Sequence, residues 1–151
     1  MEGTFSIDIE RPRAEVFAFL DDPENLPKFV PNLVDHGVIQ ETPQKVGTTF
    51  WHIYEERGRK MKMTGVVTEH RSPERLAVTL DGPFFGLEVV QTLEELGPNS
   101  TRFTQYSKGT FKHVFKLMGL LFGRKMKVEG EKAQRENFER LKALLEGGDQ
   151  A

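Results

Sequence analysis

The chain has 151 residues, of which 37% are hydrophobic and 29% are charged, and its formal net charge is −2. This length is typical of one domain with a sizeable core, and this composition excludes a disordered chain. A balance so close to neutral argues against a general nucleic-acid-binding protein. Cysteine is absent, which excludes disulfides and thiolate chemistry and fits a reducing cytoplasm.

No targeting or membrane-spanning segment is predicted. The first residues, MEGTFSIDIERPRAEVF, lack the apolar run of a secretory signal. No window holds about eighteen uncharged apolar residues, the minimum for crossing a bilayer. We therefore expect a cytoplasmic protein with one domain over residues 1–147 and a short tail at 148–151.

The N-terminal part is predicted to contain one strand and two short helices. Apolar and polar residues alternate over residues 4–10, which predicts a half-buried strand. Pro12 suits the entry of a helix, predicted at residues 14–20. A second short helix is predicted at residues 23–29.

A series of strands follows, with turn signals roughly every ten residues, as in an antiparallel sheet. Asp81-Gly82-Pro83 is one such turn, because glycine permits positive φ and proline fixes φ. The six predicted strands are residues 34–40, 47–57, 59–70, 75–80, 86–96 and 101–109.

Residues 112–146 are predicted to form one helix of about 35 residues, roughly 50 Å long. It is the available cover for the sheet. Its apolar stripe is strong at both ends but small or polar from Glu129 to Asn137. This thin middle predicts a helix that roofs a cavity. The alternative is a solid interior under a helix with a weak centre, kinked at Gly123 or Gly130.

The inward face of the predicted sheet is mostly apolar with a few polar groups, which is typical of a small-molecule site. The alternative is that these side chains simply fill the interior. Ligand contacts are predicted for Phe50, His52, Tyr54, Met61, Met63, Val78, Val89, Gln91, Phe103 and Gln105 on the strands and for Phe122 and Met126 on the helix.

Four of these residues, His52, Tyr54, Gln91 and Gln105, are polar and need partners if buried. They can pair with one another, hold water or orient a ligand. In an enzyme, His52 would be the general base, because its ordinary pKa lies near neutrality, and Tyr54 would donate to a developing enolate. No catalytic motif is visible, so these two are weak catalytic candidates.

No metal or cofactor is predicted, because the four histidines are scattered without ligand spacing. The segment GPFFG at residues 82–86 is not a phosphate loop, and its phenylalanines are expected to close one end of the cavity. Residues 113–122 are apolar with basic flanks, Lys112 and Arg124 among them. This segment can pack at the sheet rim, form a homodimer or partner contact, or rest on an anionic membrane.

The order of strand, two short helices, six-strand meander and long helix resembles the START / Bet v 1-like (SRPBCC) superfamily. IERPRAEVFAFLDDPENLPKFVPNLV, at residues 9–34, resembles the opening of its polyketide cyclase/dehydrase and lipid-transport group. VGTTF, STRFT and the run at residues 132–146 resemble that group's third strand, last strand and terminal helix. The resemblance implies an α+β helix-grip fold, in which a curved antiparallel sheet of about seven strands, two short helices and a long C-terminal helix enclose a cavity.

The resemblance also implies a partner: a hydrophobic small molecule, such as a lipid, isoprenoid or polyketide-like compound, bound between sheet and helix. The superfamily includes cyclases and ribosome-associated proteins, so the fold does not determine the function. A cyclase or dehydratase using the same cavity and a macromolecular interaction protein are the alternatives.

Overall fold

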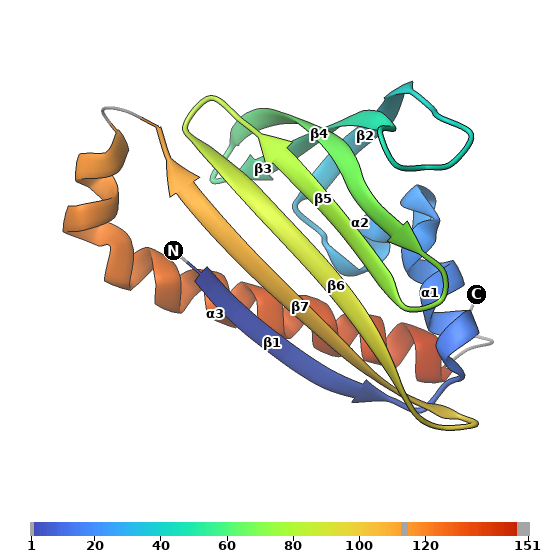
Figure 1. The fold of residues 1–151 in the computed structure, drawn as a ribbon. Coiled ribbons are helices and arrows are strands. Elements are labelled where there is room, and N and C mark those ends of the chain that lie inside the picture. Colours follow the sequence, from blue (N-terminus) through green and yellow to red (C-terminus); the bar gives the residue numbers. More distant parts are fainter. Residues whose placement is uncertain (1, 113–114, 148–151) are drawn as a thin grey trace.

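The structure, a computed structural model, describes residues 2–112 and 115–147 (Figure 1). It has the predicted α+β helix-grip fold: a curved antiparallel sheet, two short helices and a long C-terminal helix. The elements are β1 (Glu2–Ile9), α1 (Arg13–Asp21), a 3₁₀ turn (Pro23–Asn25), α2 (Leu26–Phe29), β2 (Leu33–Gln40), β3 (Thr49–Glu56), β4 (Arg59–Arg71), β5 (Arg75–Asp81), β6 (Phe85–Gly97), β7 (Ser100–Phe111) and α3 (Phe115–Gly147). The predicted tail at residues 148–151 lies outside the described residues.

All seven predicted strands are confirmed, with ends that differ by at most two residues, and they form one sheet in the order β1-β7-β6-β5-β4-β3-β2. The predicted helix at residues 23–29 is divided into a 3₁₀ turn and α2. Leu26 donates its N–H to the carbonyl of Pro23. Pro27 has no N–H to continue an α-helical ladder from Pro23, so the first turn stays 3₁₀.

The predicted start of the long helix at residue 112 is wrong. Strand β7 continues to Phe111, which pairs with Phe85 of β6, and the Lys112 N–H donates to the carbonyl of Phe84 at 2.9 Å. This pairing with a distant strand holds the backbone extended. The helix begins at Phe115, whose N–H donates to the Lys112 carbonyl at 2.8 Å.

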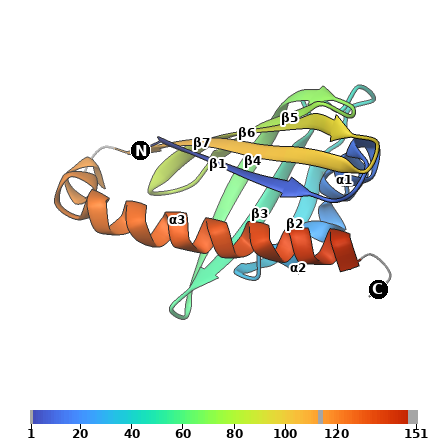
Figure 2. The same ribbon diagram turned by 90° about the horizontal axis from the view of Figure 1, so that it is seen from below.

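The sheet curves around one side of α3 (Figure 2). Because side chains alternate along a strand, one set of residues faces the helix. We call this the concave face and the opposite side the convex face. The register joins residues of the same face from strand to strand: Phe50 lies opposite Gly65, Gly65 opposite Leu80, and Leu80 opposite Leu87. Antiparallel partners share a face, so the register assigns every strand residue to one side.

The solid core lies at one end of the concave face, where α1, α2 and the end of α3 meet β1, β6 and β7. The ring of Phe138 lies 5.1 Å from that of Phe5 and 5.0 Å from that of Phe103, between centroids. The buried members of this core are Ile9, Val16, Phe17, Phe29, Leu93, Phe103, Phe138, Leu141 and Leu145.

Polar contacts fix the same end of α3 to the corner after β1. The Glu146 carboxylate accepts a hydrogen bond from the Glu10 N–H at 2.8 Å, and the Arg11 guanidinium donates to the Glu146 carbonyl at 2.8 Å. Lys142 pairs with Glu146 at 2.6 Å. The C-terminal part of the helix is therefore held by both packing and charge.

The rest of α3 is much less covered. From Arg124 to Glu136 only Met126 and Gln134 are half-buried, and the other residues are exposed. The first turns bend away from the line of the long C-terminal part (Figures 1 and 2). No helix in residues 2–112 and 115–147 is long and apolar enough to cross a membrane.

Aromatic rings hold the first turns of α3 against the sheet. The rings of Phe84 and Phe115 meet edge to face at 4.9 Å, and those of Phe85 and Phe111 lie 6.2 Å apart. A Cβ added at Gly119 would lie 2.8 Å from the ring of Phe111, so only glycine permits this approach. Phe84 of the GPFFG turn thus contacts the beginning of the helix, whereas Phe85 contacts Phe111 at the end of β7.

Replacing Phe138 by alanine tests the anchor, by which we mean the packing of the C-terminal part of α3 against β1 and β7. Phe138 is 3% exposed, so Phe138→Ala should lower the free energy of unfolding by about 3 to 5 kcal/mol in urea titrations, through lost burial and the cavity left behind. Leu120→Ala is the control, because Leu120 is 83% exposed and its loss should cost less than about 0.5 kcal/mol. Equal effects of the two substitutions would contradict this account of the anchor.

Candidate functional site

The concave face away from the core is a half-buried apolar surface. Phe50, Met61, Val78 and Val89 are all partly exposed there, while Met63 is 2% exposed. They come from β3, β4, β5 and β6, whose alternation turns these residues toward the side of α3. Because the middle of α3 buries little of its own surface, this part of the sheet is not sealed like the core.

One polar pair, His52 and Tyr54, lies on this surface. Both side chains come from β3, two residues apart and therefore on the same face. His52 Nδ1 and the Tyr54 hydroxyl are 2.9 Å apart, and the Phe50 and His52 ring centroids are 4.9 Å apart. Opposite them on β4 lie Met61 and Met63, so apolar side chains flank the pair.

Burial keeps both members of this pair neutral. It lowers the pKa of His52 to about 4, with a smaller effect from the nearby His36. Burial raises the pKa of Tyr54 to about 12. If the Tyr54 hydroxyl donates to Nδ1, the imidazole carries its proton on Nε2. If His52 donates instead, the Tyr54 proton is left, so either arrangement offers one further donor.

His36 is a member of this site that the sequence did not reveal. It lies directly opposite His52 in the β2–β3 pairing, and the two therefore share the concave face. The alternation of side chains along β2 could have predicted that a residue of this strand lies on the concave face beside His52. The β2–β3 pairing shifts register on both sides of His36, between Leu33 and Asp35 and between Val38 and Gln40. The position of His36 opposite His52 depends on these irregularities.

Gly65 shapes the floor of the site. A Cβ at this position would lie 2.4 Å from the Phe50 ring and 2.8 Å from Leu80. The Phe50 ring therefore lies over the bare backbone of β4, in the space that a side chain would fill. This packing fixes the ring beside His52.

Gln91 and Gln105 form a second polar pair, in which the Gln91 amide donates to the Gln105 side-chain carbonyl at 2.8 Å. Gln91 lies opposite Leu76, near the beginning of β5. His52 and Met63 form a cross-strand row that continues to the other end of β5, beside Asp81. The two rows are roughly 15 to 20 Å apart along the strands. The four predicted polar residues thus form two separate pairs.

Two predicted ligand contacts lie elsewhere. Phe103 is completely buried against Phe138, so it belongs to the core rather than to a surface that a ligand can reach. Phe122 is 53% exposed, because this part of α3 does not close over the sheet. Met126 is half-buried in the thinly covered part of the helix.

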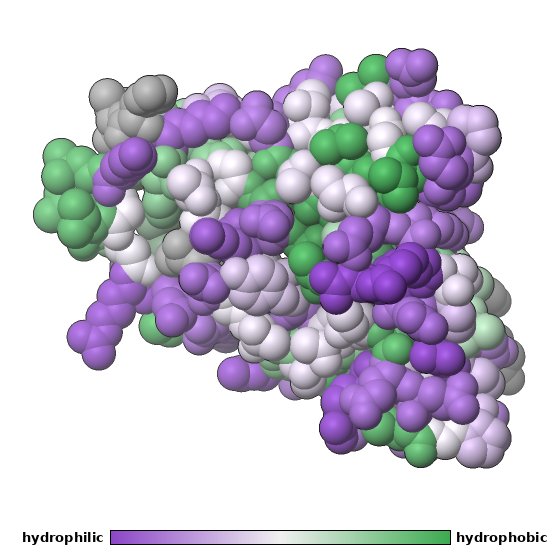
Figure 3. All heavy atoms as spheres, viewed as in Figure 1, coloured by the Kyte–Doolittle hydropathy of each residue, from purple (hydrophilic) through white to green (hydrophobic). Residues whose placement is uncertain are grey.

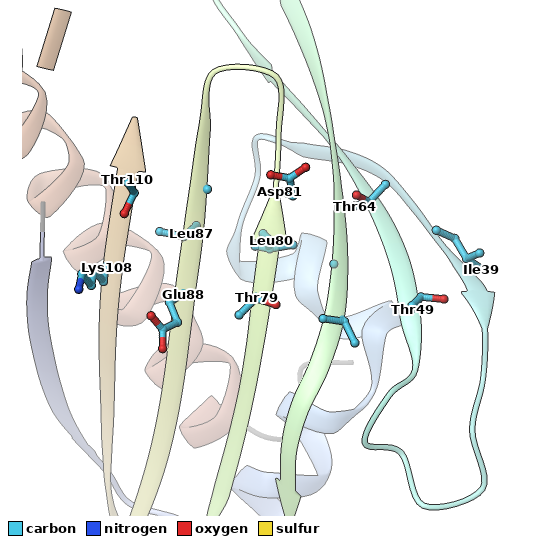
Figure 4. Close-up of a pocket in the computed structure, with 13 residues that line it drawn as sticks. Ile39, Thr49, Thr64, Thr79, Leu80, Asp81, Leu87, Glu88, Lys108 and Thr110 are labelled. Atoms are coloured by element: carbon cyan, nitrogen blue, oxygen red, sulfur yellow. The ribbon is translucent and has the colours of Figure 1, made fainter. Parts of the chain in front are cut away.

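The larger of two hollows described on the surface lies mainly on the convex face and not under the helix. It has a volume of about 720 Å³, and its lining includes Thr49, Thr64, Glu88 and Lys108 (Figure 4). The register places these four side chains on the face turned away from α3. This hollow is open, and its lining combines apolar side chains such as Ile39 and Val66 with threonines and charged residues.

The other hollow, of about 640 Å³, lies at the outer edge of β1, beside the Asp8–Arg102 ion pair. Among the described residues, no three histidine or carboxylate side chains are grouped so that they could hold a metal ion. The concave surface combines apolar area with the hydrogen-bonding groups of His52 and Tyr54.

Comparison with known proteins gives a family match. The model of the family described as polyketide cyclase / dehydrase and lipid transport matches residues 2–146. No curated protein sequence shows a significant match.

Solved structures show the same fold at low sequence identity. A protein from Thermus thermophilus has a TM-score of 0.81 at 15% identity, over 99% of both chains. A START superfamily protein from Mycobacterium smegmatis has a TM-score of 0.71 at 16% identity, over 97% of this chain and 94% of that one. An aromatase/cyclase from Streptomyces sp. R1128 has a TM-score of 0.76 at 11% identity, over 95% and 92%. At these identities the likeness extends to the fold alone.

The lowered pKa of His52 predicts a pH-dependent stability. The unfolded chain takes up a proton near the ordinary pKa of 6.5, whereas folded His52 takes it up only near 4. Stability from this group is therefore complete above pH 6.5 and decreases as the pH falls to about 4, by at most about 3 kcal/mol. In urea titrations, His52→Gln should lose less stability over this range than the unsubstituted protein. An identical loss in both would contradict the shift.

Adding a methyl group at Gly65 tests the packing of the Phe50 ring over the backbone of β4. Gly65→Ala should lower the free energy of unfolding by about 1 to 3 kcal/mol, because the Phe50 ring must move. Gly3→Ala in β1 is the matched control, since a Cβ there meets nothing within 4 Å. Thermal unfolding of both variants checks this, and equal midpoints would contradict the packing.

Proposed function

The chain belongs to the polyketide cyclase / dehydrase and lipid transport family, and from this premise we propose that it binds a hydrophobic small molecule on the concave face. The ligand would be a lipid, isoprenoid or polyketide-like compound with an apolar body and one carbonyl or hydroxyl oxygen. Phe50, Met61, Val78 and Val89 would contact the apolar body, and the His52–Tyr54 pair would donate to the oxygen.

The observation that carries this proposal is the neutral His52–Tyr54 pair on a half-buried apolar surface. An apolar wall with one oriented donor is what a lipid-like ligand with a single oxygen requires. Met61 and Met63 beside the pair are unbranched and adapt to an irregular shape. A charged pair at this place would instead select an ionic ligand.

The same pair favours binding over proton-transfer catalysis. A general base works best when its pKa lies near the working pH. Burial lowers the pKa of His52 to about 4, which makes it a weak base, and raises that of Tyr54 to about 12, which makes it a weak acid. A cyclase or dehydratase is the second candidate, supported by the hydrogen bond between these two groups.

Substitutions of two adjacent residues of β5 test on which face of the sheet the ligand binds. Val78 lies on the concave face and Thr79 lines the convex hollow. Val78→Lys should weaken binding of a pyrene-labelled fatty acid by about tenfold or more, because it places an ammonium group against an apolar ligand. Thr79→Lys should change binding by less than about twofold. Native mass spectrometry of the freshly purified protein should show an apolar ligand that Val78→Lys removes.

The reverse result, with Thr79→Lys abolishing binding, would place the ligand on the convex face and contradict the proposal. Circular dichroism of both variants checks that they remain folded. His52→Ala separates the two candidates. For a carrier it should weaken binding by only about fivefold, the value of one hydrogen bond. For an enzyme it should reduce turnover by orders of magnitude while the ligand still binds.

A further inference from the structure

The beginning of α3 carries the most exposed apolar side chains of the described chain. Leu117 is 62% exposed, Leu120 83%, Leu121 67% and Val128 62%. Figure 3 shows a hydrophobic cluster at the end of the molecule where α3 begins. Exposing several large apolar residues together costs solubility, and such patches usually mark an interaction surface.

The spacing of these residues puts them on one side of the helix. Leu117, Leu121 and Val128 are four and seven residues apart, which places them within about 40° of one another around the axis. Phe115, Gly119 and Met126 have the same spacing on the opposite side, and they are half-buried, as is Gly123. The helix therefore buries its side with the small residue Gly119 and exposes its leucine side.

Basic residues border this leucine side. Around the helix axis, Lys125 lies on one flank of the leucine side, and Lys116 and Lys127 lie on the other. Arg124 lies within the leucine side. Within the described part of the chain, none of the four forms an ion pair. Residues 112–128 contain five basic residues and no acidic residue, although the whole chain has a net charge of −2.

We propose that this surface, Leu117, Leu120, Leu121 and Val128 with Lys116, Arg124, Lys125 and Lys127, docks on an anionic lipid membrane. Leucine side chains would enter the boundary between headgroups and acyl chains, and the long basic side chains would extend to the lipid phosphates. A second copy of this surface would bring the unpaired cations together, so charge disfavours self-association. The aromatic contacts of Phe84 and Phe111 would hold the docked turns in place.

Co-sedimentation of the full chain with vesicles tests the proposal. The protein should bind vesicles of phosphatidylcholine with phosphatidylserine, bind those of phosphatidylcholine alone much more weakly, and dissociate as salt is raised. Leu121→Glu, and separately Lys125→Glu with Lys127→Glu, should each lower the partition coefficient by about tenfold or more.

Matched controls carry the same changes on other surfaces. Ile39→Glu alters an apolar side chain that is 58% exposed on β2, and Arg59→Glu with Lys60→Glu makes the same charge change at the β3–β4 turn. Both should bind vesicles within about twofold of the unsubstituted protein. Val78→Lys should do so too, since docking does not depend on the ligand site.

Three results would overturn the proposal. One is the absence of binding to phosphatidylserine vesicles. Another is a loss of binding in the control variants equal to that in the helix variants. The third is a dimer in solution that Leu121→Glu dissociates, without vesicle binding, which would assign the surface to a second copy of the chain.

Discussion

The end of α3 is fixed by Phe138, whose ring contacts Phe5 of β1 and Phe103 of β7. The rest of the molecule depends on this contact, because it makes one end of the concave face a solid core. The first turns of the helix are held separately, by Phe84 and Phe111. Between these two attachments the helix buries little, and the concave face stays half-exposed. A helix that is held at both ends and little buried in the middle leaves this part of the concave face accessible.

The chemistry of the open part of the face follows from its burial. A half-buried histidine and tyrosine remain neutral because charging either would cost desolvation energy. Neutrality suits a hydrogen bond to a carbonyl or hydroxyl oxygen better than proton transfer. Charged side chains line the convex hollow, the β1 edge and the exposed side of α3. This distribution separates the proposed ligand-binding surface on the concave face from the proposed docking surface on α3.

Much of the fold could be predicted from the sequence, because alternation assigns each strand residue to a face once the strands are recognised. Phe50, His52, Tyr54 and Met61 share a face for this reason. What could not be predicted depends on contacts between distant segments. The extension of β7 to Phe111 depends on pairing with β6. The other features that were not predicted depend on the strand register and on the path of α3. They are His36 opposite His52, the buried Phe103 and the exposed Phe122.

Methyl signals of the methionines would test the central claim, that the ligand lies between the concave face and α3. The chain has five methionines, and Met61 and Met63 lie beside the His52–Tyr54 pair. In protein with isotope-labelled methionine methyl groups, titration with a fatty acid should shift the nuclear magnetic resonance signals of both. Single substitutions of these residues to leucine would assign the signals. Saturating binding that leaves both signals unchanged would contradict the account.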